Sequence, residues 1–160
     1  MKKLILLFLI VIFSCQTQKN DKGVLEGVWE REASIQYENG QPQDTFPFGN
    51  EINKAKMFKV YTKSHVMWLN NANNIDSLTG EDLYPGAGAF ATKYSVMNDE
   101  LMEYLILGTD NVASWFEPLI LEGEKGYKFT AKVDVSENHY SQGNLDSLGN
   151  GFFELWKRIE

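Results

Sequence analysis

Residues 86–107 read GAGAFATKYSVMNDELMEYLIL, and this stretch decides the class of fold. Apolar and polar side chains alternate on both sides of Asn98-Asp99, a pair that favours a two-residue hairpin turn. Alternation with a period of two predicts two antiparallel strands. The first strand places three large side chains on one face: Phe90, Tyr94 and Val96. The return strand places a carboxyl group among apolar side chains on its own face: Leu101, Glu103, Leu105 and Leu107.

The same alternation recurs along the chain, and no window of twelve residues shows clean helical periodicity. The segments that predict strands are 25–37, 56–62, 65–69, 86–97, 101–107, 114–121, 127–135, 139–142 and 152–159. Residues 44–53 and 70–85 predict loops. In the segment 56–62, Phe58 and Val60 are expected on one face and Lys59 on the other.

Eight to ten antiparallel strands joined by short turns leave two unpaired edges unless the sheet closes. The sequence therefore predicts an all-β fold, an antiparallel up-and-down β-barrel of eight to ten strands. An open sandwich of two sheets is the alternative architecture.

Composition limits the function. The chain has 160 residues, of which 43% are hydrophobic and 13% aromatic, as expected for one globular domain. Its net charge of -7 argues against a nucleic-acid partner, because no basic field neutralises phosphates. A single cysteine excludes an internal disulfide and any metal site built from several cysteines.

The first residues predict an export signal. After Met1-Lys2-Lys3, ten apolar residues (4–13) are too few to span a bilayer but fit a secretory signal. Residues 12–15, Ile-Phe-Ser-Cys, resemble the lipobox of bacterial lipoproteins, in which the cysteine is acylated after cleavage. An ordinary signal peptide with an incidental cysteine is the alternative.

The lipobox resemblance implies that Cys15 carries lipid and becomes the first residue of the mature protein. The expected organisation is a lipoprotein signal peptide (1–14), a polar tether (15–24) and a barrel domain (25–160). The expected location is the cell envelope, with the protein anchored to the bacterial outer membrane on its periplasmic or its surface face.

Both ends of the predicted domain carry a motif. Residues 25–29, Leu-Glu-Gly-Val-Trp, resemble the G-x-W signature that opens lipocalins and other calycin barrels. Residues 154–158, Glu-Leu-Trp-Lys-Arg, resemble the end of the last strand in that superfamily. Between them, residues 61–68 and 86–90 are similar to lipocalin-like lipoprotein domains of Bacteroidetes-type bacteria.

The lipocalin resemblance implies a structural signature formed by Gly27, Trp29 and Arg158. Trp29 is expected to plug the closed end of the barrel, and Arg158 to cover its ring through a cation–π contact. Gly27 is expected to let the backbone bend where the ring crosses. Trp156 is likewise expected to be structural.

Glu103 is the main candidate for a functional side chain, because a carboxyl group on an inward face must be paired, hydrogen-bonded or neutral. Its expected partner is His65, Tyr94 or a lysine. Two interpretations stay open. Glu103 is either a satisfied polar group of the core or a group that orients a ligand inside the barrel.

Aromatic side chains indicate either a pocket or a filled interior, since an eight-stranded barrel is just wide enough for side chains or one small ligand. Four of them on mid-chain strands are expected on the wall of a pocket: Trp68, Tyr94, Trp115 and Tyr140. His65 and Glu103 complete the predicted binding set. No metal-binding spacing of histidines and no nucleophile motif is present, and no cofactor or metal ion is expected.

These features predict a lipid-anchored envelope barrel that binds a small, mainly apolar ligand. One alternative is a protein-interaction or inhibitor lipoprotein that uses the segments 39–53 and 70–86 to contact an envelope protein. A second alternative is a barrel enzyme with His65 and Glu103 as acid and base.

Overall fold

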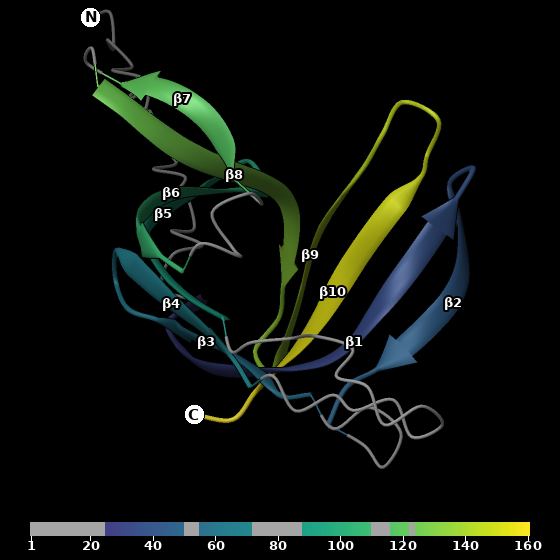
Figure 1. Ribbon diagram of the computed structural model, residues 1–160. Helices are drawn as coiled ribbons and strands as arrows, with labels where there is room; N and C mark the ends of the chain where they lie inside the picture. Colours follow the sequence, from purple (N-terminus) through teal and green to yellow (C-terminus); the bar gives the residue numbers. More distant parts are fainter. Residues whose placement is uncertain (1–24, 50–54, 72–87, 110–115, 122–123) are drawn as a thin grey trace, which may run out of the picture.

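The computed structural model describes residues 25–49, 55–71, 88–109, 116–121 and 124–160 (Figure 1). These residues form a single antiparallel sheet of ten strands. The strands are β1 (Gly27–Glu38), β2 (Gln41–Pro47), β3 (Met57–Tyr61), β4 (His65–Asn70), β5 (Gly88–Met97), β6 (Glu100–Gly108), β7 (Glu117–Leu121), β8 (Glu124–Val135), β9 (His139–Leu145) and β10 (Gly151–Arg158). Among these residues, no helix has the length and hydropathy that crossing a bilayer requires.

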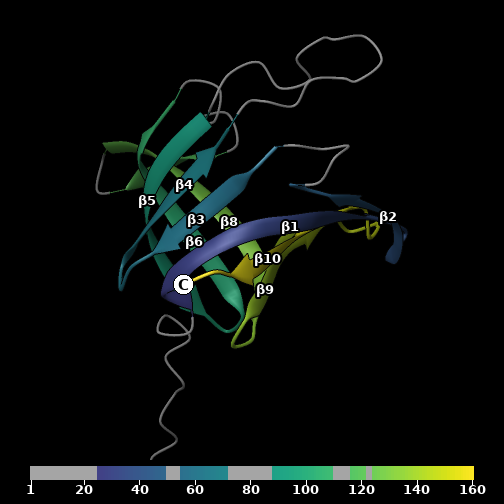
Figure 2. The same cartoon turned by 90° about the horizontal axis from the view of Figure 1, so that it is seen from below.

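The last strand pairs with the first and closes the sheet into a barrel. The strands follow the order β10-β9-β8-β6-β5-β4-β3-β1, and β10 pairs with β1 from Trp29↔Arg158 to Tyr37↔Gly151. Figure 2 shows the C-terminus beside the start of β1. The predicted up-and-down barrel is confirmed, and the sandwich is wrong. The strand pairs of the described residues lie within Gly27–Arg158, and the β10–β1 pairing that closes the barrel is among them.

Two long strands change neighbours along their length, which makes one end of the barrel wider. On one edge, β1 pairs first with β3 over Gly27–Glu30 and then with β2 over Ala33–Glu38. Likewise, β8 pairs with β7 and then with β6. Only Lys132–Val135 of β8 pairs with β9. Away from this short ladder the two strands diverge, so the barrel has a closed end near the C-terminus and an open end opposite (Figure 1).

The short β8–β9 ladder ends at a side chain. The amide group of Asn144 donates from Nδ2 to the carbonyl of Thr130, and its Oδ1 accepts from the backbone amide of Lys132 at 3.2 Å. This side chain therefore occupies the position that a further backbone pair would take. Beyond it, the ladder does not continue.

Trp29 plugs the closed end as the resemblance implies. Its ring is fully buried, and its Nε1 donates to the carbonyl of Leu25 at 2.7 Å. The guanidinium carbon of Arg158 lies 4.1 Å from the ring centroid, and Nε of Arg158 donates to the carbonyl of Glu137 at 2.7 Å. Cation–π attraction and hydrogen bonds thus hold the chain end over the plug.

Gly27 does more than allow the expected bend, because it also leaves room for the side chain of Arg158. Its φ is +134°, a conformation that side chains rarely adopt. A Cβ at this position would lie 2.4 Å from Nη1 of Arg158 and 2.4 Å from the carbonyl oxygen of Glu160. The absent side chain is therefore what allows the guanidinium to reach Trp29.

Three expectations about strands are corrected. Residues 44–47, expected at the start of the loop 44–53, instead belong to β2, because the Asn39-Gly40 turn (φ 52° and 74°) folds this strand back onto β1. The two prolines of β2 fit its position at a sheet edge. Leu107 does not share the inward face of β6. The β5–β6 pairing shifts by one residue between Ala91↔Leu107 and Thr92↔Leu105, and this bulge turns Leu107 outward, where it is exposed.

The third correction concerns β3. Met57, Lys59 and Tyr61 are buried inside the barrel, while Phe58 and Val60 face outward and are half-buried. The lysine, and not Phe58 or Val60, therefore points into the core. The polar partners of Lys59, described below, explain why the strand is stable with this lysine facing inward.

We expect Trp29→Ala to lower the free energy of unfolding by about 3–5 kcal/mol, because a large buried ring leaves an unfilled space. Urea denaturation followed by circular dichroism measures the change. Phe152→Ala is the control, since about half of that side chain is exposed. Equal effects of the two substitutions would contradict the role of Trp29 as the plug.

Candidate functional site

A buried ion pair lies at the centre of the barrel. Lys59 of β3 and Glu103 of β6 are almost fully buried, and Nζ lies 2.8 Å from Oε1. Nζ also donates to Oε1 of Gln142 at 2.9 Å and lies 3.3 Å from the hydroxyl of Tyr61. These three contacts match the three donors of an ammonium group. The pair is therefore satisfied within the protein.

The ion pair continues into a layer of polar side chains across the barrel. Gln142 donates from Nε2 to Oε2 of Glu154 at 2.8 Å, and Nη1 of Arg31 lies 3.0 Å from Oε1 of Glu154. We call Arg31, Lys59, Glu103, Gln142 and Glu154 the polar layer. It joins five strands, and its two cations balance its two carboxylates.

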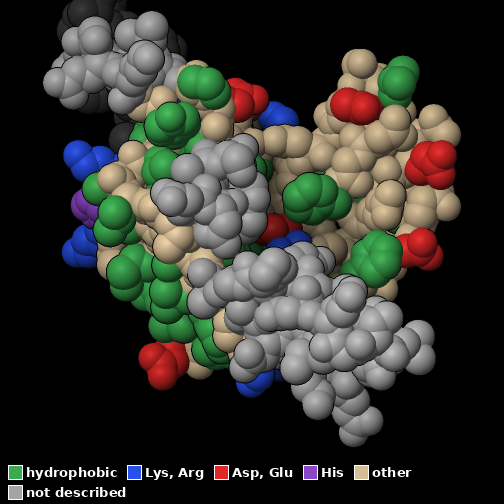
Figure 3. All heavy atoms as spheres, in the orientation of Figure 1, with side chains coloured by type: hydrophobic (Ala, Val, Ile, Leu, Met, Phe, Trp, Pro, Cys, Tyr) green, Lys and Arg blue, Asp and Glu red, His purple; other side chains and the backbone are tan. Residues whose placement is uncertain are grey.

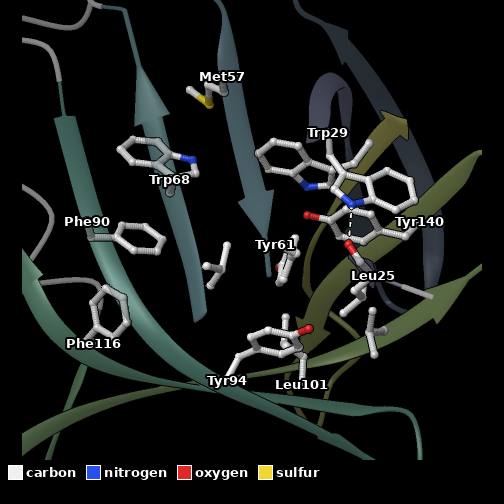
Figure 4. Packing of buried hydrophobic residues seen from close by; sticks show 13 residues of the cluster. Leu25, Trp29, Met57, Tyr61, Trp68, Phe90, Tyr94, Leu101, Phe116 and Tyr140 are labelled. Carbon is white, nitrogen blue, oxygen red and sulfur yellow. Dashed lines mark hydrogen bonds between the residues drawn. The ribbon is translucent and has the colours of Figure 1, made fainter. Parts of the chain in front are cut away.

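Aromatic side chains fill the closed side of the polar layer (Figure 4). The ring of Tyr140 stacks on Trp156 at 5.8 Å and meets the ring of Trp29 edge-on at 4.8 Å. Tyr61 meets Tyr94 edge-on at 5.0 Å. This half of the barrel is therefore packed core.

Burial strengthens the protonated state of these phenols. It raises the pKa of Tyr61 and Tyr140 well above the usual value, and it raises the pKa of Tyr94 to about 12. The three hydroxyls, which an ordinary phenol pKa already leaves protonated at neutral pH, therefore stay protonated at higher pH as well. Tyr61 can then donate to Oε1 of Glu103, which lies 3.3 Å away, and Tyr94 donates to the carbonyl of Thr62 at 2.8 Å.

One wall near the open end is aromatic. The rings of Trp68 and Phe90 stack at 5.3 Å, and Phe116 meets Phe90 edge-on at 5.2 Å. Phe129 of β8 extends this group, with its ring 6.2 Å from that of Phe116. We call Trp68, Phe90, Phe116 and Phe129 the aromatic wall. In Figure 4, its first three members lie opposite Trp29 and Tyr140.

The opposite wall carries two further phenylalanines. Phe46 of β2 pairs with Ser34, and Ser34 pairs with Glu154, so the three share the inward face. Phe152 lies two residues before Glu154 on β10 and shares that face by alternation. About half of each phenylalanine side chain is exposed. Figure 3 shows a hollow between the two halves of the barrel, with acidic and basic side chains at its floor.

Four predicted binding residues lie inside the barrel: Trp68, Tyr94, Glu103 and Tyr140. Only Trp68 belongs to the aromatic wall. Tyr94 and Tyr140 are packed in the closed half, and Glu103 is held by Lys59. Glu103 is thus paired with a lysine, one of the partners expected for it.

His65 does not lie on a wall of the barrel. It is the first residue of β4, its side chain is exposed on the outer face, and its Nδ1 lies 2.9 Å from the hydroxyl of Ser64. Because Glu103 is buried inside, the proposed acid–base pair of His65 and Glu103 is wrong. Trp115 and Cys15 lie outside the described residues.

Sequence reasoning missed Arg31, Lys59, Gln142 and Glu154. Lys59 alternates with Met57 and Tyr61, which are both large enough to fill a core. This alternation is the signal that could have placed Lys59 on the inward face. The other three each lie two residues from a buried aromatic side chain on the same strand: Trp29, Tyr140 or Trp156. Alternation places them on the same inward face, so this spacing is the signal that could have found them.

The outer surface carries a separate shallow depression of about 250 Å³ beside β9 and β10. Its polar lining includes His139 and Glu32, whose Nε2 and Oε2 atoms lie 3.6 Å apart. Within the described part of the chain, no three His, Cys, Asp or Glu side chains gather as a metal ion would require.

Comparison with known proteins adds two similar structures. No protein-family model matches the sequence, and no curated protein matches it. A lipocalin-like protein from Bacteroides uniformis ATCC 8492 superposes with a TM-score of 0.49 at 17% identity, covering 86% of this chain and 100% of that one. An uncharacterized protein from Bacteroides eggerthii DSM 20697 gives a TM-score of 0.45 at 14% identity, covering 84% and 98%.

The assignment of a lipocalin-like barrel therefore depends on this chain's own features. The closed eight-stranded meander and the contact of Arg158 with Trp29 are the architecture that the terminal motifs predict. The extra strands β2 and β7 lengthen the walls at the open end.

We expect Glu103→Leu to destabilise the protein by about 3–5 kcal/mol, because it leaves the ammonium of Lys59 buried without a counter-charge. The double variant Lys59→Met, Glu103→Leu is expected to recover most of this loss. Urea denaturation of the two variants measures the difference.

The exposed pair Lys132–Glu100, at 3.6 Å, provides the control. Glu100→Leu is expected to change stability by less than about 1 kcal/mol, since solvent screens that pair. A similar cost at both carboxylates would show that the polar layer does not hold the barrel together.

Proposed function

We propose that this protein is a lipid-anchored binding protein of the cell envelope that holds a small, mainly apolar ligand at the open end of its barrel. The observation that carries the proposal is the pair of half-exposed, inward phenylalanines, Phe46 and Phe152. They stand on the wall opposite the aromatic wall. A ligand between the two walls would remove this apolar surface from water, which favours binding.

The polar layer supports a ligand without net charge. Its cations and carboxylates are already balanced, and Lys59 has no donor left for a ligand. A buried ionic group on the ligand would therefore lack a free counter-charge and would cost desolvation energy. An apolar molecule with at most a few neutral polar groups fits the layer best.

The enzyme alternative has little support from the site. Glu103 is paired with Lys59 inside the barrel, while His65 points away from it. The described open end presents aromatic side chains and a polar layer whose charges are balanced. This arrangement suits retention of a molecule better than proton transfer.

We expect the neutral dye Nile red to bind the barrel and to change the tryptophan emission, because Trp68 lies on the aromatic wall. Phe152→Ala is expected to weaken binding about ten-fold, as the loss of a contacting ring implies. Met97→Ala is the matched control, because Met97 is similarly exposed but lies at the β5–β6 turn. Equal affinities of the two variants would refute binding at the open end.

Native mass spectrometry of the protein purified from its own host would identify a retained ligand. A retained molecule that is anionic and strongly polar would contradict the proposed ligand class.

We expect Cys15→Ser to move the protein from the membrane fraction to the soluble fraction of lysed host cells, since acylation at Cys15 would provide the anchor. Immunoblotting of the separated fractions measures the distribution. Thr17→Ser, in the predicted tether and outside the lipobox-like residues, is the control for expression. An unchanged membrane fraction for Cys15→Ser would mean that lipid on this residue is not the anchor.

A further inference from the structure

An apolar surface covers the outside of the barrel on the side away from β9 and β10. One row of directly paired, outward residues crosses five strands: Val28, Val60, Met67, Ala91 and Leu107. A second row lies beside it: Phe58, Leu69 and Ala89. At its β1 end this row is bounded by Glu30, which pairs with Phe58 and whose Oε1 lies 3.8 Å from Nζ of Lys56. We call the eight apolar residues of the two rows the outer apolar face. Figure 3 shows hydrophobic side chains gathered over this half of the barrel.

The outer apolar face departs from the usual pattern of an antiparallel barrel, in which outward residues are polar. Exposure is 49% for Met67, 47% for Leu69 and 70% for Leu107. Because these residues are neighbours in register, the exposed apolar surface is continuous. Continuous apolar surface of this kind marks a contact with a membrane or with another protein.

A basic edge borders the face toward the closed end. His65 pairs with Lys93 in the next outward row, and Lys63 lies in the turn before β4. The side chains of all three are exposed. This local positive charge contrasts with a net charge of -7 for the whole chain. Its complement is a surface that is apolar inside and negatively charged at its boundary, as anionic phospholipid bilayers are.

The position of the N-terminal segment favours the same partner. The described chain starts at Leu25, three residues before Val28, which belongs to the outer apolar face. The ten residues 15–24 can extend to about 33–36 Å at most. If Cys15 carries lipid, this segment keeps the face within reach of the bilayer, and in this respect the inference rests on the proposed function.

We propose that the outer apolar face docks on the surface of an anionic phospholipid bilayer. Met67, Leu69 and Leu107 enter the boundary between headgroups and acyl chains, and Lys63 and Lys93 contact the anionic headgroups. Docking adds a second, weaker attachment to the lipid on Cys15. A second copy of the chain fits less well, because the same face of that copy carries the same basic edge and offers it no negative complement.

Vesicle flotation of the chain from Gln16 to Glu160 tests this proposal, because the β10–β1 pairing that closes the barrel lies within this chain. The vesicles contain phosphatidylethanolamine with phosphatidylglycerol, and phosphatidylcholine vesicles serve for comparison. We expect flotation with the anionic vesicles that weakens as salt is raised. Met67→Glu and Leu107→Glu are expected to weaken it at least about ten-fold.

Two variants control for exposure alone. Leu148 is 70% exposed, as Leu107 is, and Met97 is 57% exposed, but both lie outside the face. Leu148→Glu and Met97→Glu are expected to float like the unchanged protein. Lys93→Glu leaves the apolar residues intact and is expected to reduce the preference for anionic over neutral vesicles. It keeps the proposal testable if Met67→Glu does not fold.

Three results would overturn the proposal. They are no flotation of the unchanged protein, equal losses in face and control variants, and a dimer in light scattering that Met67→Glu converts to a monomer. The last result would assign the face to a second copy. The chain used for flotation, Gln16 to Glu160, lacks Cys15. Failed flotation would therefore not contradict the lipid anchor, which the fractionation experiment tests, or ligand binding, which the Nile red measurement tests.

Discussion

The hydrogen bonds between β10 and β1 hold the two ends of the chain together, and the rest of the structure depends on them. They turn an antiparallel meander into a closed surface, so that an inside exists. The interior side chains then need a seal, which Trp29 provides at one end with Arg158 across its ring. The approach of that guanidinium in turn requires a residue without a side chain at position 27.

The fold was largely predictable because strand alternation and turn residues are local signals. The positions of most strands and the Asn98-Asp99 turn followed from them. The pairing of the chain ends followed from the need to remove free sheet edges and from the resemblance of the two end motifs to lipocalins. The phase of β3 did not follow, because burial of Lys59 depends on Glu103 and Gln142, which lie 44 and 83 residues later in the chain. Local periodicity assigns a lysine to water unless such distant partners are known.

The candidate site was predictable in part for the same reason. Trp68 and Glu103 were expected inside and are inside. Glu103, however, is paired with Lys59 in the polar layer and is not free to orient a ligand, and Tyr140 belongs to the packed half. The phenylalanines of the opposite wall, Phe46 and Phe152, were not expected there. Their direction follows from pairings of β2 and β10 with β1, and β2 itself was not predicted.

The polar layer divides the barrel into two parts with different physical properties. On one side, tyrosine and tryptophan rings pack without charge, and burial keeps the phenols protonated. On the other side, apolar rings face a hollow. Since the layer joins five strands through charged and amide side chains, it fixes the width of the barrel at its middle. Changes at the open end therefore need not disturb the closed end.

The side chain of Asn144 gives the open end a further property. The backbone pairing of β8 with β9 does not continue along their full length, because it stops at the side-chain amide of this residue. Beyond this point β8 and β9 can separate at the open end at the cost of side-chain hydrogen bonds alone, and every backbone pair between them is kept. If the open end holds a ligand as proposed, its width can therefore differ from one ligand to another.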